Sequence, residues 1–410
     1  MQGARTMTNL DRLIGLLCPD GVEQKTLGEI CTIGAGGTPQ RGNIEYWENG
    51  TIKWLGSTVC KNIKNVDEIT GYITELGLKN SSAKVLMPGT TLIAMIGATI
   101  GKIAYLTFEA TTNQNVAALY PLETEKLDTS YLFYACQMLF PQFIALSSGG
   151  KLAIANLTFI RGLHVPVPPL PVQREIVRIL DNFTELTAEL TAELTARKKQ
   201  YNYYRDELLT FDDDVPVVAL GEIGEFVRGN GLQKKDFTED GFPCIHYGQI
   251  YTKYGLFADS TFSYVADEFA GKLRKAQNGD LLIATTSENV EDVCKAVAWL
   301  GDEVAISGDM MYFRSNQNVK YLAYLFQTGS FFEQKQRYAH GTKVIRVSRE
   351  NLERILIPLP HLDEQQRIVD ILDRFDALVS DISSGLPAEI AVRQKQYEYY
   401  RDKLLTFKGA

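Results

Sequence analysis

The chain has 410 residues, more than a single hydrophobic core commonly serves, so we expect two or three domains. Its composition, 45% hydrophobic and 22% charged, is typical of a globular protein in water, and no apolar run approaches the roughly 20 residues that cross a bilayer. The formal net charge of −8 does not by itself point to a nucleic-acid-binding protein.

The cysteines and histidines exclude two further classes of protein. The six cysteines lie far apart with no C-x-x-C pair, which argues against a disulfide framework or a zinc site and favours reduced thiols in the cytoplasm. The four histidines show no metal-ligand spacing. The early apolar run "LIGLLC" (13–18) lacks a signal-peptide cleavage pattern. We therefore expect a cytoplasmic protein without a metal site.

The chain begins with a segment that resembles a later one. Residues 13–30, "LIGLLCPDGVEQKTLGEI", are similar in order and length to residues 206–223, "DELLTFDDDVPVVALGEI". Because residues 206–211 close a helical segment, we expect residues 1–21 to complete a helical region as its last turn. Residues 22–164 then combine a buried strand pattern, "TTLIAMIG", with a short helical one, "SYLFYACQMLF" (130–140), which predicts a mixed globular segment.

A long helix is predicted in the next segment, 165–211. Apolar residues recur there at spacings of three and four, and no Pro or Gly interrupts 172–210, so a helix of about 39 residues and roughly 58 Å is expected. The apolar positions are Ile176, Val177, Ile179, Leu180, Phe183, Leu186, Leu190 and Leu194. Such a helix cannot bury its apolar stripe alone and needs a helical partner. It contains the threefold repeat "ELTAELTAELTA" (185–196).

The second half of the chain follows the same plan. Residues 212–356 contain the strand pattern "DLLIATTS" and the helical pattern "YLAYLFQTGSFF" (321–332). Residues 357–410 form a second helical tail, in which "SSGLP" (383–387) should kink or break the helix. Between Lys335 and Arg349 five basic residues occur without an acidic one. Local charge there is opposite to the net charge of the chain.

These similarities amount to an internal repeat. Residues 166–183 align without a gap to 358–375, "YNYYRDELLTF" aligns to "YEYYRDKLLTF", and "LGEI" occurs at 27–30 and at 220–223. The sequence therefore predicts a mixed α/β (α+β) fold with two globular domains related by a pseudo-twofold. Two long antiparallel helices, forming a coiled coil, would join these domains.

The candidate motifs for catalysis or nucleotide binding lack the required spacing or residues. In "IGATIGKIAY" (96–105) the glycines are four residues apart instead of five, and Ile103 stands where a phosphate loop needs Ser or Thr. "GAGGTP" (34–39) lacks the third glycine of a dinucleotide fingerprint. Signatures of hydrolases, zinc proteases and base-amino methyltransferases are also missing from the sequence.

Polar loops supply the candidate site instead. Arg can reach the guanine edge, and Asn or Gln the adenine edge, in the DNA major groove. Polar loops are often only solvated, but here both copies place them at matching positions after "LGEI". The candidates for DNA binding are Gln40, Arg41, Asn43, Ser57, Thr58, Lys61, Asn62, Lys64, Arg228, Asn230, Gln233, Lys234, Lys235, His246, Tyr247, Gln249 and Lys253, with Lys151, Lys343 and Arg346 expected to hold phosphates.

The tail sequences resemble a known family. "PVQREIVRILDNF" with "RKKQYNYYRDELLTF", and "DEQQRIVDILDRF" with "RQKQYEYYRDKLLTF", are similar to the specificity subunit of type I restriction–modification systems, and the likeness covers nearly the whole chain. It implies a non-catalytic chain with target-recognition domains at 22–164 and 212–356. Each domain would read one half of a split DNA target, with the helical regions 165–211 and 357–410 as a ruler between them.

The resemblance also implies partners and cofactors. Besides double-stranded DNA, these are two modification subunits, which bind S-adenosylmethionine and methylate adenine N6, and two restriction subunits, which use ATP with Mg²⁺. This chain itself would hold no cofactor and contact no membrane.

The resemblance further implies that the number of repeats at 185–196 sets the length of the unread spacer. The interval from Phe183 to Tyr201 is 18 residues, whereas the matching interval from Phe375 to Tyr397 is 22. One more "TAEL" would lengthen a helix by ~6 Å and rotate it ~40° beyond a full turn.

Two other classes of function stay open at this point. A two-headed protein–protein scaffold on a coiled coil would suit the acidic net charge, although the polar loops oppose it. A nuclease or methyltransferase with an unrecognised site is disfavoured by the missing motifs.

Overall fold

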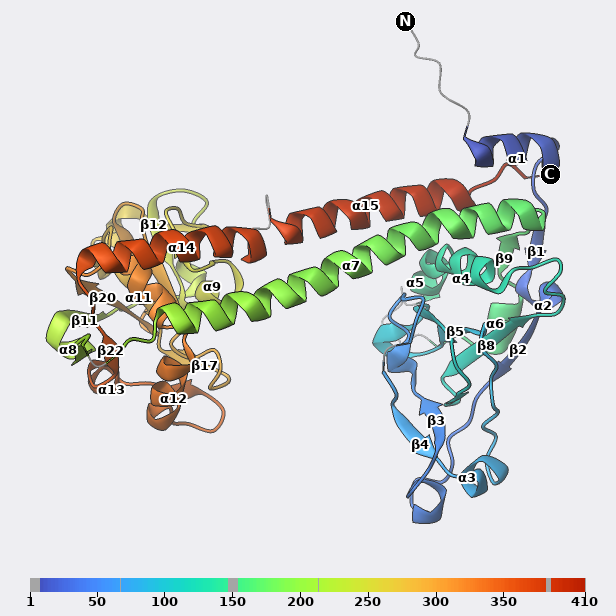
Figure 1. Cartoon of the computed structure of the whole chain (residues 1–410), viewed down its shortest axis with the longest axis horizontal. Coiled ribbons are helices and arrows are strands. Elements are labelled where there is room, and N and C mark those ends of the chain that lie inside the picture. Colours follow the sequence, from blue (N-terminus) through green and yellow to red (C-terminus); the bar gives the residue numbers. More distant parts are fainter. Residues whose placement is uncertain (1–7, 67, 147–153, 213, 381–384, 410) are drawn as a thin grey trace, which may run out of the picture. The chain divides into compact units, whose positions relative to one another are not determined.

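Figure 1 shows the computed structural model, which describes residues 8–66, 68–146, 154–212, 214–380 and 385–409. The chain forms two compact units, one made of Met1–Ala188 with Val392–Ala410 and the other of Glu189–Ala391. Each unit contains one globular head and parts of the long helices. The unit boundaries therefore fall inside the helical regions and not between the five segments expected from the sequence.

Two sheets form the first head. The larger sheet is antiparallel, with strand order β2-β8-β5-β6, and in the smaller sheet β3 pairs antiparallel with β4 and parallel with β7. The strands are β2 (Cys31–Ala35), β3 (Ile52–Leu55), β4 (Gly71–Ile73), β5 (Thr91–Ala94), β6 (Ile103–Tyr105), β7 (Thr111–Thr112) and β8 (Val116–Pro121). The apolar run predicted as a buried strand supplies β5, all of whose residues are buried.

The second head repeats this pairing. Its larger sheet has the order β11-β20-β16-β18-β13, and in its smaller sheet β12 pairs antiparallel with β14 and parallel with β19, as β3 does with β4 and β7. The strands are β11 (Gly224–Arg228), β12 (Phe242–Ile245), β13 (Phe257–Ala258), β14 (Ser263–Val265), β15 (Lys275–Ala276), β16 (Leu281–Ala284), β18 (Ala296–Trp299), β19 (Val304–Ile306) and β20 (Met310–Ser315). The duplicated topology confirms that the chain contains one fold twice.

The "LGEI" motifs form short helices where the chain enters each head. α2 (Leu27–Ile30) packs against α6 (Leu157–Arg161), and α8 (Leu220–Ile223) packs against α13 (Arg349–Glu353). A Cβ added to the glycine of either motif would lie 3.0–3.1 Å from the Cβ of Arg161 or Glu353, so this close packing favours glycine. The adjoining ladders pair β1 (Gln24–Thr26) with β9 (His164–Pro166), and β10 (Val217–Ala219) with β22 (Leu356–Pro358).

A buried helix covers the larger sheet of each head. α4 (Thr129–Gln137) and α11 (Val319–Leu325) are capped by the side chains of Asp128 and Asn318, which accept hydrogen bonds from the first turn. Both helices stop earlier than the sequence predicted. Separate helices, α5 (Phe140–Leu146) and α12 (Gly329–Tyr338), follow them.

The first tail is the single helix α7 (Leu170–Leu208), whose 39 residues match the predicted length. The second tail consists of α14 (Leu362–Ser380) and α15 (Leu386–Leu405), so the helix does end near the predicted "SSGLP" break. Residues 381–384 of that break lie outside the described part of the chain.

Each unit combines the start of one tail with the end of the other. The first unit's core contains Val172, Ile176 and Leu180 of α7 together with Leu405 of α15. The second unit's core contains Ile368 and Leu372 of α14 together with Tyr201 of α7. Within each unit, Figure 1 shows the two helices side by side and running in opposite directions. The predicted antiparallel pairing is therefore confirmed within each unit.

The N-terminal segment contains a helix of its own. α1 (Asn9–Leu17) begins with a capping box between Thr8 and Asp11, so it is more than the last turn expected from the sequence. Its Leu10 lies in the same core as Leu405, and the backbone N–H of Val22 donates to the carbonyl of Lys408 at 3.0 Å. The segment thus packs on the end of the second tail.

The remaining elements are short, namely α3 (Glu75–Lys79), α9 (Tyr247–Thr252), α10 (Asp267–Ala270), β17 (Thr286–Ser287) and β21 (Ile345–Arg346), with 3-10 turns at Ile44–Tyr46, Ser57–Val59, Gly97–Thr99 and Lys234–Asp236. Among the described helices, none combines the length and the apolar character that a membrane span needs.

Candidate nucleic-acid interface

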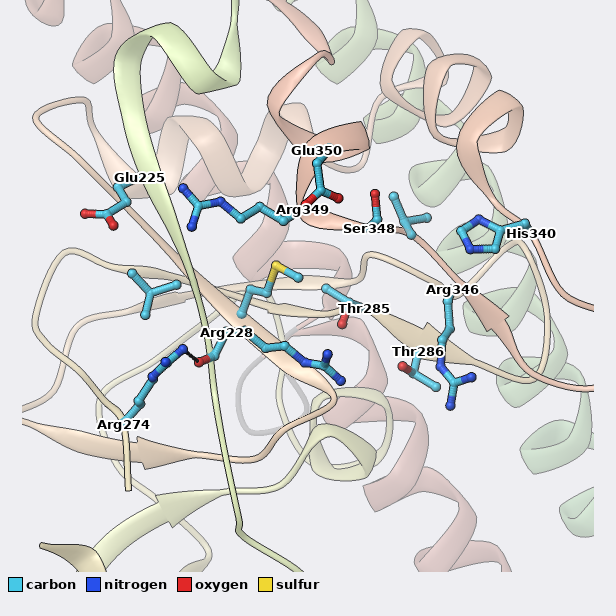
Figure 2. A pocket seen from close by; sticks show the side chains of 13 residues that line it. Glu225, Arg228, Arg274, Thr285, Thr286, His340, Arg346, Ser348, Arg349 and Glu350 are labelled. Atoms are coloured by element: carbon cyan, nitrogen blue, oxygen red, sulfur yellow. Dashed lines mark hydrogen bonds between the residues drawn. The ribbon is translucent and has the colours of Figure 1, made fainter. Parts of the chain in front are cut away.

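A basic cleft lies on the second head (Figure 2). It has a volume of about 700 Å³ and is bounded by β11, by the β17–β21 ladder and by the start of α13. We call it the arginine cleft, because four arginines line it against two glutamates. Its charged and polar lining residues are Glu225, Arg228, Arg274, Thr285, Thr286, His340, Arg346, Ser348, Arg349 and Glu350.

Local backbone geometry places Arg346 at the cleft. β17 and β21 pair so that Thr286 faces Arg346, and the backbones of His340 and Arg346 exchange hydrogen bonds of 3.1 and 2.9 Å. The loop between them turns at Gly341, where φ is +124°, and an added Cβ would lie 2.0 Å from the carbonyl of Val344. Glycine is therefore needed at position 341 for the turn.

Arg228 and Arg274 lie next to each other at the other end of the cleft (Figure 2). Arg228 Nε donates to the carbonyl of Gly308 at 2.7 Å, and Arg274 Nη1 donates to the carbonyl of Arg228 at 2.7 Å. Each guanidinium keeps further N–H donors beyond the one used in its anchor. Anchored arginines lose less conformational freedom when they bind a ligand.

The remaining charges leave the cleft positive. Arg349 is paired with Glu353 at 2.6 Å, and this hydrogen bond raises the pKa of Arg349. Hydrogen bonds from its own backbone N–H and from Ser348 lower the pKa of Glu350, which therefore stays ionised. Within the described residues, the guanidinium of Arg346 has no hydrogen-bond or ion-pair partner. Such a lining suits phosphate oxygens or the O6 and N7 atoms of guanine.

Of the residues predicted in the second head, only Arg228 and Arg346 line the arginine cleft. Several others are held within the fold. Asn230 bonds the backbone of Lys272 and of Arg274, at 2.9 and 2.6 Å. His246 is buried, caps α9 and accepts a hydrogen bond from Gly248 N, while Gln249 completes that cap and bonds Ser263. These side chains have structural partners, which the sequence did not reveal.

The other predicted residues of the second head lie elsewhere on it. The backbone N–H of Gln233 donates to the carboxylate of Asp236 at 2.8 Å across the short helical turn of Lys234 and Lys235, and both lysines are exposed. The ring of Tyr247 lies 4.6 Å from that of His246. Exposed Lys253 places its ammonium 5.8 Å from the ring of Phe262, and Lys343 is exposed.

In the first head, several predicted residues have partners within the chain. Lys64 is paired with Asp181 at 2.6 Å and is largely buried, so its ammonium serves an internal contact. Asn62 has a φ of +61° and accepts a hydrogen bond from Ile103 N at 3.0 Å, which makes it a turn residue. Lys61 is paired with Glu68, although both are exposed.

The other candidates of the first head remain on its surface. The side chains of Gln40, Arg41 and Thr58 are exposed, while Ser57 is half-buried. Asn43 caps the turn that follows it by accepting from Glu45 N at 3.2 Å. Lys151 falls outside the described residues.

The position in the first head that matches Arg346 holds an apolar residue, Ile154. Ile96 forms a bridge with Ile154, as Thr286 does with Arg346, and Asn156 caps α6 as Ser348 caps α13. Ile154 is 65% exposed. Where the second head presents an arginine, the first head thus presents an isoleucine. Two copies of one fold offer different chemistry at the same position.

Three basic lining residues, Arg274, His340 and Arg349, were not among the residues predicted from the sequence. Arg349 belongs to the basic run from Lys335 to Arg349. Neither His340 nor Arg274 shows a sequence pattern that separates it from other surface residues. The basic residues of this run also differ in their environment. Lys335 is buried, donates to the carbonyls of Glu291 and Val293 at 2.7 Å each, and has its pKa lowered by burial. It holds a loop instead of facing a ligand.

Comparison with known proteins agrees with the duplicated fold. Residues 19–197 and 212–392 each match the model of the type I restriction modification DNA specificity domain. A putative type I restriction enzyme specificity subunit from Haemophilus influenzae is 34% identical over 307 residues, covering 69% of this chain and 73% of the relative. The EcoR124I/EcoR124II specificity subunit from Escherichia coli is 39% identical over 250 residues, covering 59% of this chain and 61% of the relative.

A solved structure shares the fold. A chain from a structure described as the basis of complex assembly and conformational transition of the type I R-M system superposes with a TM-score of 0.62 at 17% identity, covering 94% of this chain and 98% of the other. At this identity the likeness concerns the fold alone.

Proposed function

Because the chain belongs to the type I restriction modification DNA specificity family, we propose that it recognises a bipartite DNA target, with one half-site read by each head. The observation that carries this proposal is the pair of matched positions, Arg346 and Ile154, in two copies of one fold. An arginine suits guanine or phosphate, whereas an isoleucine suits a thymine methyl group. Two heads that differ in this way would read different sequences.

In the second head the arginine cleft is the proposed contact surface. Arg228 and Arg346 would be the residues that approach base edges or phosphates, and Arg274 would support Arg228 through its carbonyl. In the first head, the exposed candidates Gln40 and Arg41 would take the corresponding part. The net negative charge of the chain suggests that partner subunits help to hold the DNA.

The helix α7 would set the distance between the two half-sites. It contributes Leu180 to the first core and Tyr201 to the second, so a fixed number of helical residues separates these two cores along the chain. The repeat at 185–196 lies in this interval, with Leu186, Leu190 and Leu194 half-buried and its glutamates exposed. A helix of this kind turns a change in residue number into a defined translation and rotation.

The partner subunits would carry out the catalysis. We assign S-adenosylmethionine to two modification subunits that methylate adenine, and ATP with Mg²⁺ to two restriction subunits. This chain would position these subunits on the DNA and hold no cofactor itself. Within the described residues, no group of three or more His, Cys, Asp or Glu side chains is placed to hold a metal ion.

The test is to sequence methylated adenines in cells that express the chain with its modification subunit. The expected result is one motif with two defined half-sites and a constant undefined gap. A contiguous motif, or methylation that does not depend on this chain, would contradict the proposal. A gel-shift assay of the same complex with DNA, run beside a protein-only control, distinguishes DNA recognition from a protein-only scaffold.

A further inference from the structure

In the first unit, a carboxylate on the long helix binds two side chains of the head. Asp181 of α7 accepts a hydrogen bond from Tyr134 Oη of α4 at 2.6 Å. It also accepts from Lys64 Nζ at 2.6 Å, and the side chains of Lys64 and Asp181 are only 17% and 28% exposed. Charge-assisted hydrogen bonds of this kind are directional, because each donor must meet a lone pair of the carboxylate.

The second unit contains the same arrangement. Asp373 of α14 accepts from Tyr324 Oη of α11 at 2.7 Å and from Lys320 Nζ at 2.6 Å. Asp373 and Tyr324 occupy the positions that match Asp181 and Tyr134 in the repeat. The carboxylate and the hydroxyl are therefore features of the duplicated unit.

The two lysines, by contrast, do not occupy matching positions in the repeat. Lys320 lies in the first turn of α11, where its backbone N–H donates to the cap residue Asn318. Ser130 holds that place in α4, since its backbone N–H donates to the cap residue Asp128. Lys64 comes instead from a loop that follows the Ser57–Val59 turn. Each unit thus supplies an ammonium to the carboxylate at the matching helix position, but the two lysines come from different parts of the fold.

Stability alone does not account for this arrangement. The apolar residues Ile176, Leu180, Ile368 and Leu372 already bury the contact between each helix and its head. A half-buried ion pair adds little net stability compared with apolar packing, but it selects one geometry among several that an apolar surface would allow.

We propose that Asp181 and Asp373 are positioning residues that fix the rotation of each head about its helix. With this rotation fixed, a change in helix length is passed to the head as a defined change in its angle around the DNA. The inference rests on the proposed bipartite recognition and adds the residues through which the spacing would be enforced.

The experiment measures spacer selectivity. The full chain with its modification subunits methylates DNA substrates that keep both half-sites and differ in the gap by one base pair. In Asp181→Asn and Asp373→Asn we expect unchanged half-sites but about a tenfold loss of preference for the native gap, the effect of losing one charge-assisted hydrogen bond. Glu364→Gln, which removes a half-buried carboxylate of α14 that is paired to Arg367 of the same helix, is the matched control and should keep the preference.

A relocation variant tests the role of the ammonium. Lys64→Met should lose selectivity like Asp181→Asn, and adding Ser130→Lys should restore it, because the lysine then stands where the second head has Lys320. A merely structural role predicts equal loss of methylation at every gap, together with a lower unfolding temperature, and that result would overturn the inference. Unchanged selectivity in Asp181→Asn would overturn it as well.

Failure of the proposed function gives a different pattern. Removal of one "TAEL" unit, measured in parallel, should shift the preferred gap if the helix sets the spacing. If that shift occurs while Asp181→Asn behaves like the unchanged chain, only the positioning role is wrong. If neither the unchanged chain nor the shortened one discriminates between gaps, both the positioning role and the helical ruler are wrong.

Discussion

Phe183 stacks on Tyr400, with ring centroids 5.3 Å apart and 23° between the ring planes. The matching pair of the other unit, Phe375 and Tyr204, has centroids 6.1 Å apart at 25°. In each pair the Phe belongs to the start of one tail and the Tyr to the end of the other. Neither tail therefore completes a unit by itself, and the stretch between the Phe and the Tyr of one tail separates two stacking contacts.

The first prediction concerns that stretch. Removing or adding one "TAEL" within 184–196 should leave both half-sites unchanged and alter only the gap, since the heads are untouched. Leucines four residues apart stay on nearly the same face of the helix, so the apolar stripe of Leu186, Leu190 and Leu194 is preserved. The measurement is the methylated motif in cells that carry each variant with its modification subunit.

Deletions of two or three residues are the control for this prediction. They rotate everything downstream by about 200° or 300°, which takes the apolar stripe out of register. We expect loss of assembly or of methylation. An active protein with unchanged spacing after a four-residue change would show that the segment is only a tolerant linker.

The second prediction concerns the stacked rings. Phe183→Ala should lower the free energy of unfolding of its unit by about 1–2 kcal/mol, because a half-buried ring and its stacking partner are lost. Tyr203→Ala, which truncates a ring that is 65% exposed on the same helix as Phe183, should change stability by less than about 0.5 kcal/mol. Urea unfolding of the purified chain measures both; equal effects would refute a role for the stacking.

The third prediction assigns the half-sites. Arg228→Ala should cost about 1–3 kcal/mol and relax one position in one half-site, whereas Gln40→Ala should affect only the other half-site. Lys343→Ala should weaken all sequences alike and reduce the salt dependence of binding by about one charge. Motif sequencing and salt titrations of binding distinguish these outcomes. If Arg228→Ala and Gln40→Ala both left motif and affinity unchanged, the assignment would fail.

The fourth prediction concerns acid stability. Burial, with a smaller contribution from Lys234, lowers the pKa of His246 below its ordinary 6.5, and its Nδ1 accepts from Gly248 N only when that nitrogen is unprotonated. As the pH falls below 6.5, the unfolded chain takes up a proton before the folded chain does, so the folded state loses stability. His246→Asn keeps a capping side chain without the titration and should remove this part of the acid sensitivity.

Urea unfolding at pH 7.5 and pH 5.5 tests the fourth prediction. The difference in stability between the two pH values should be smaller in His246→Asn than in the unchanged chain. The target sequence should stay the same, because the imidazole is buried beneath the surface of the head. A changed methylation motif would instead return His246 to the residues that read DNA.

The sequence by itself determined the architecture. The apolar spacing without Pro or Gly predicted a helix over 172–210, and the structure has one over Leu170–Leu208. The "LGEI" repeats predicted two heads of one fold, which the strand pairing confirms. These features follow from patterns that are local along the chain, or that recur in it, so they do not depend on knowing which distant residues meet.

Only the tertiary structure decided which polar side chains are free to bind a ligand. Lys64 and Asn230 are of residue types that commonly bind DNA. Asp181 binds the side chain of Lys64, however, and the backbone near Arg274 binds that of Asn230. Arg274 reaches the arginine cleft only because folding brings its loop to the end of β11 beside Arg228. A charged or amide group is satisfied by whichever partner lies within about 3 Å. That partner is set by packing between distant segments, which residue type and spacing do not encode.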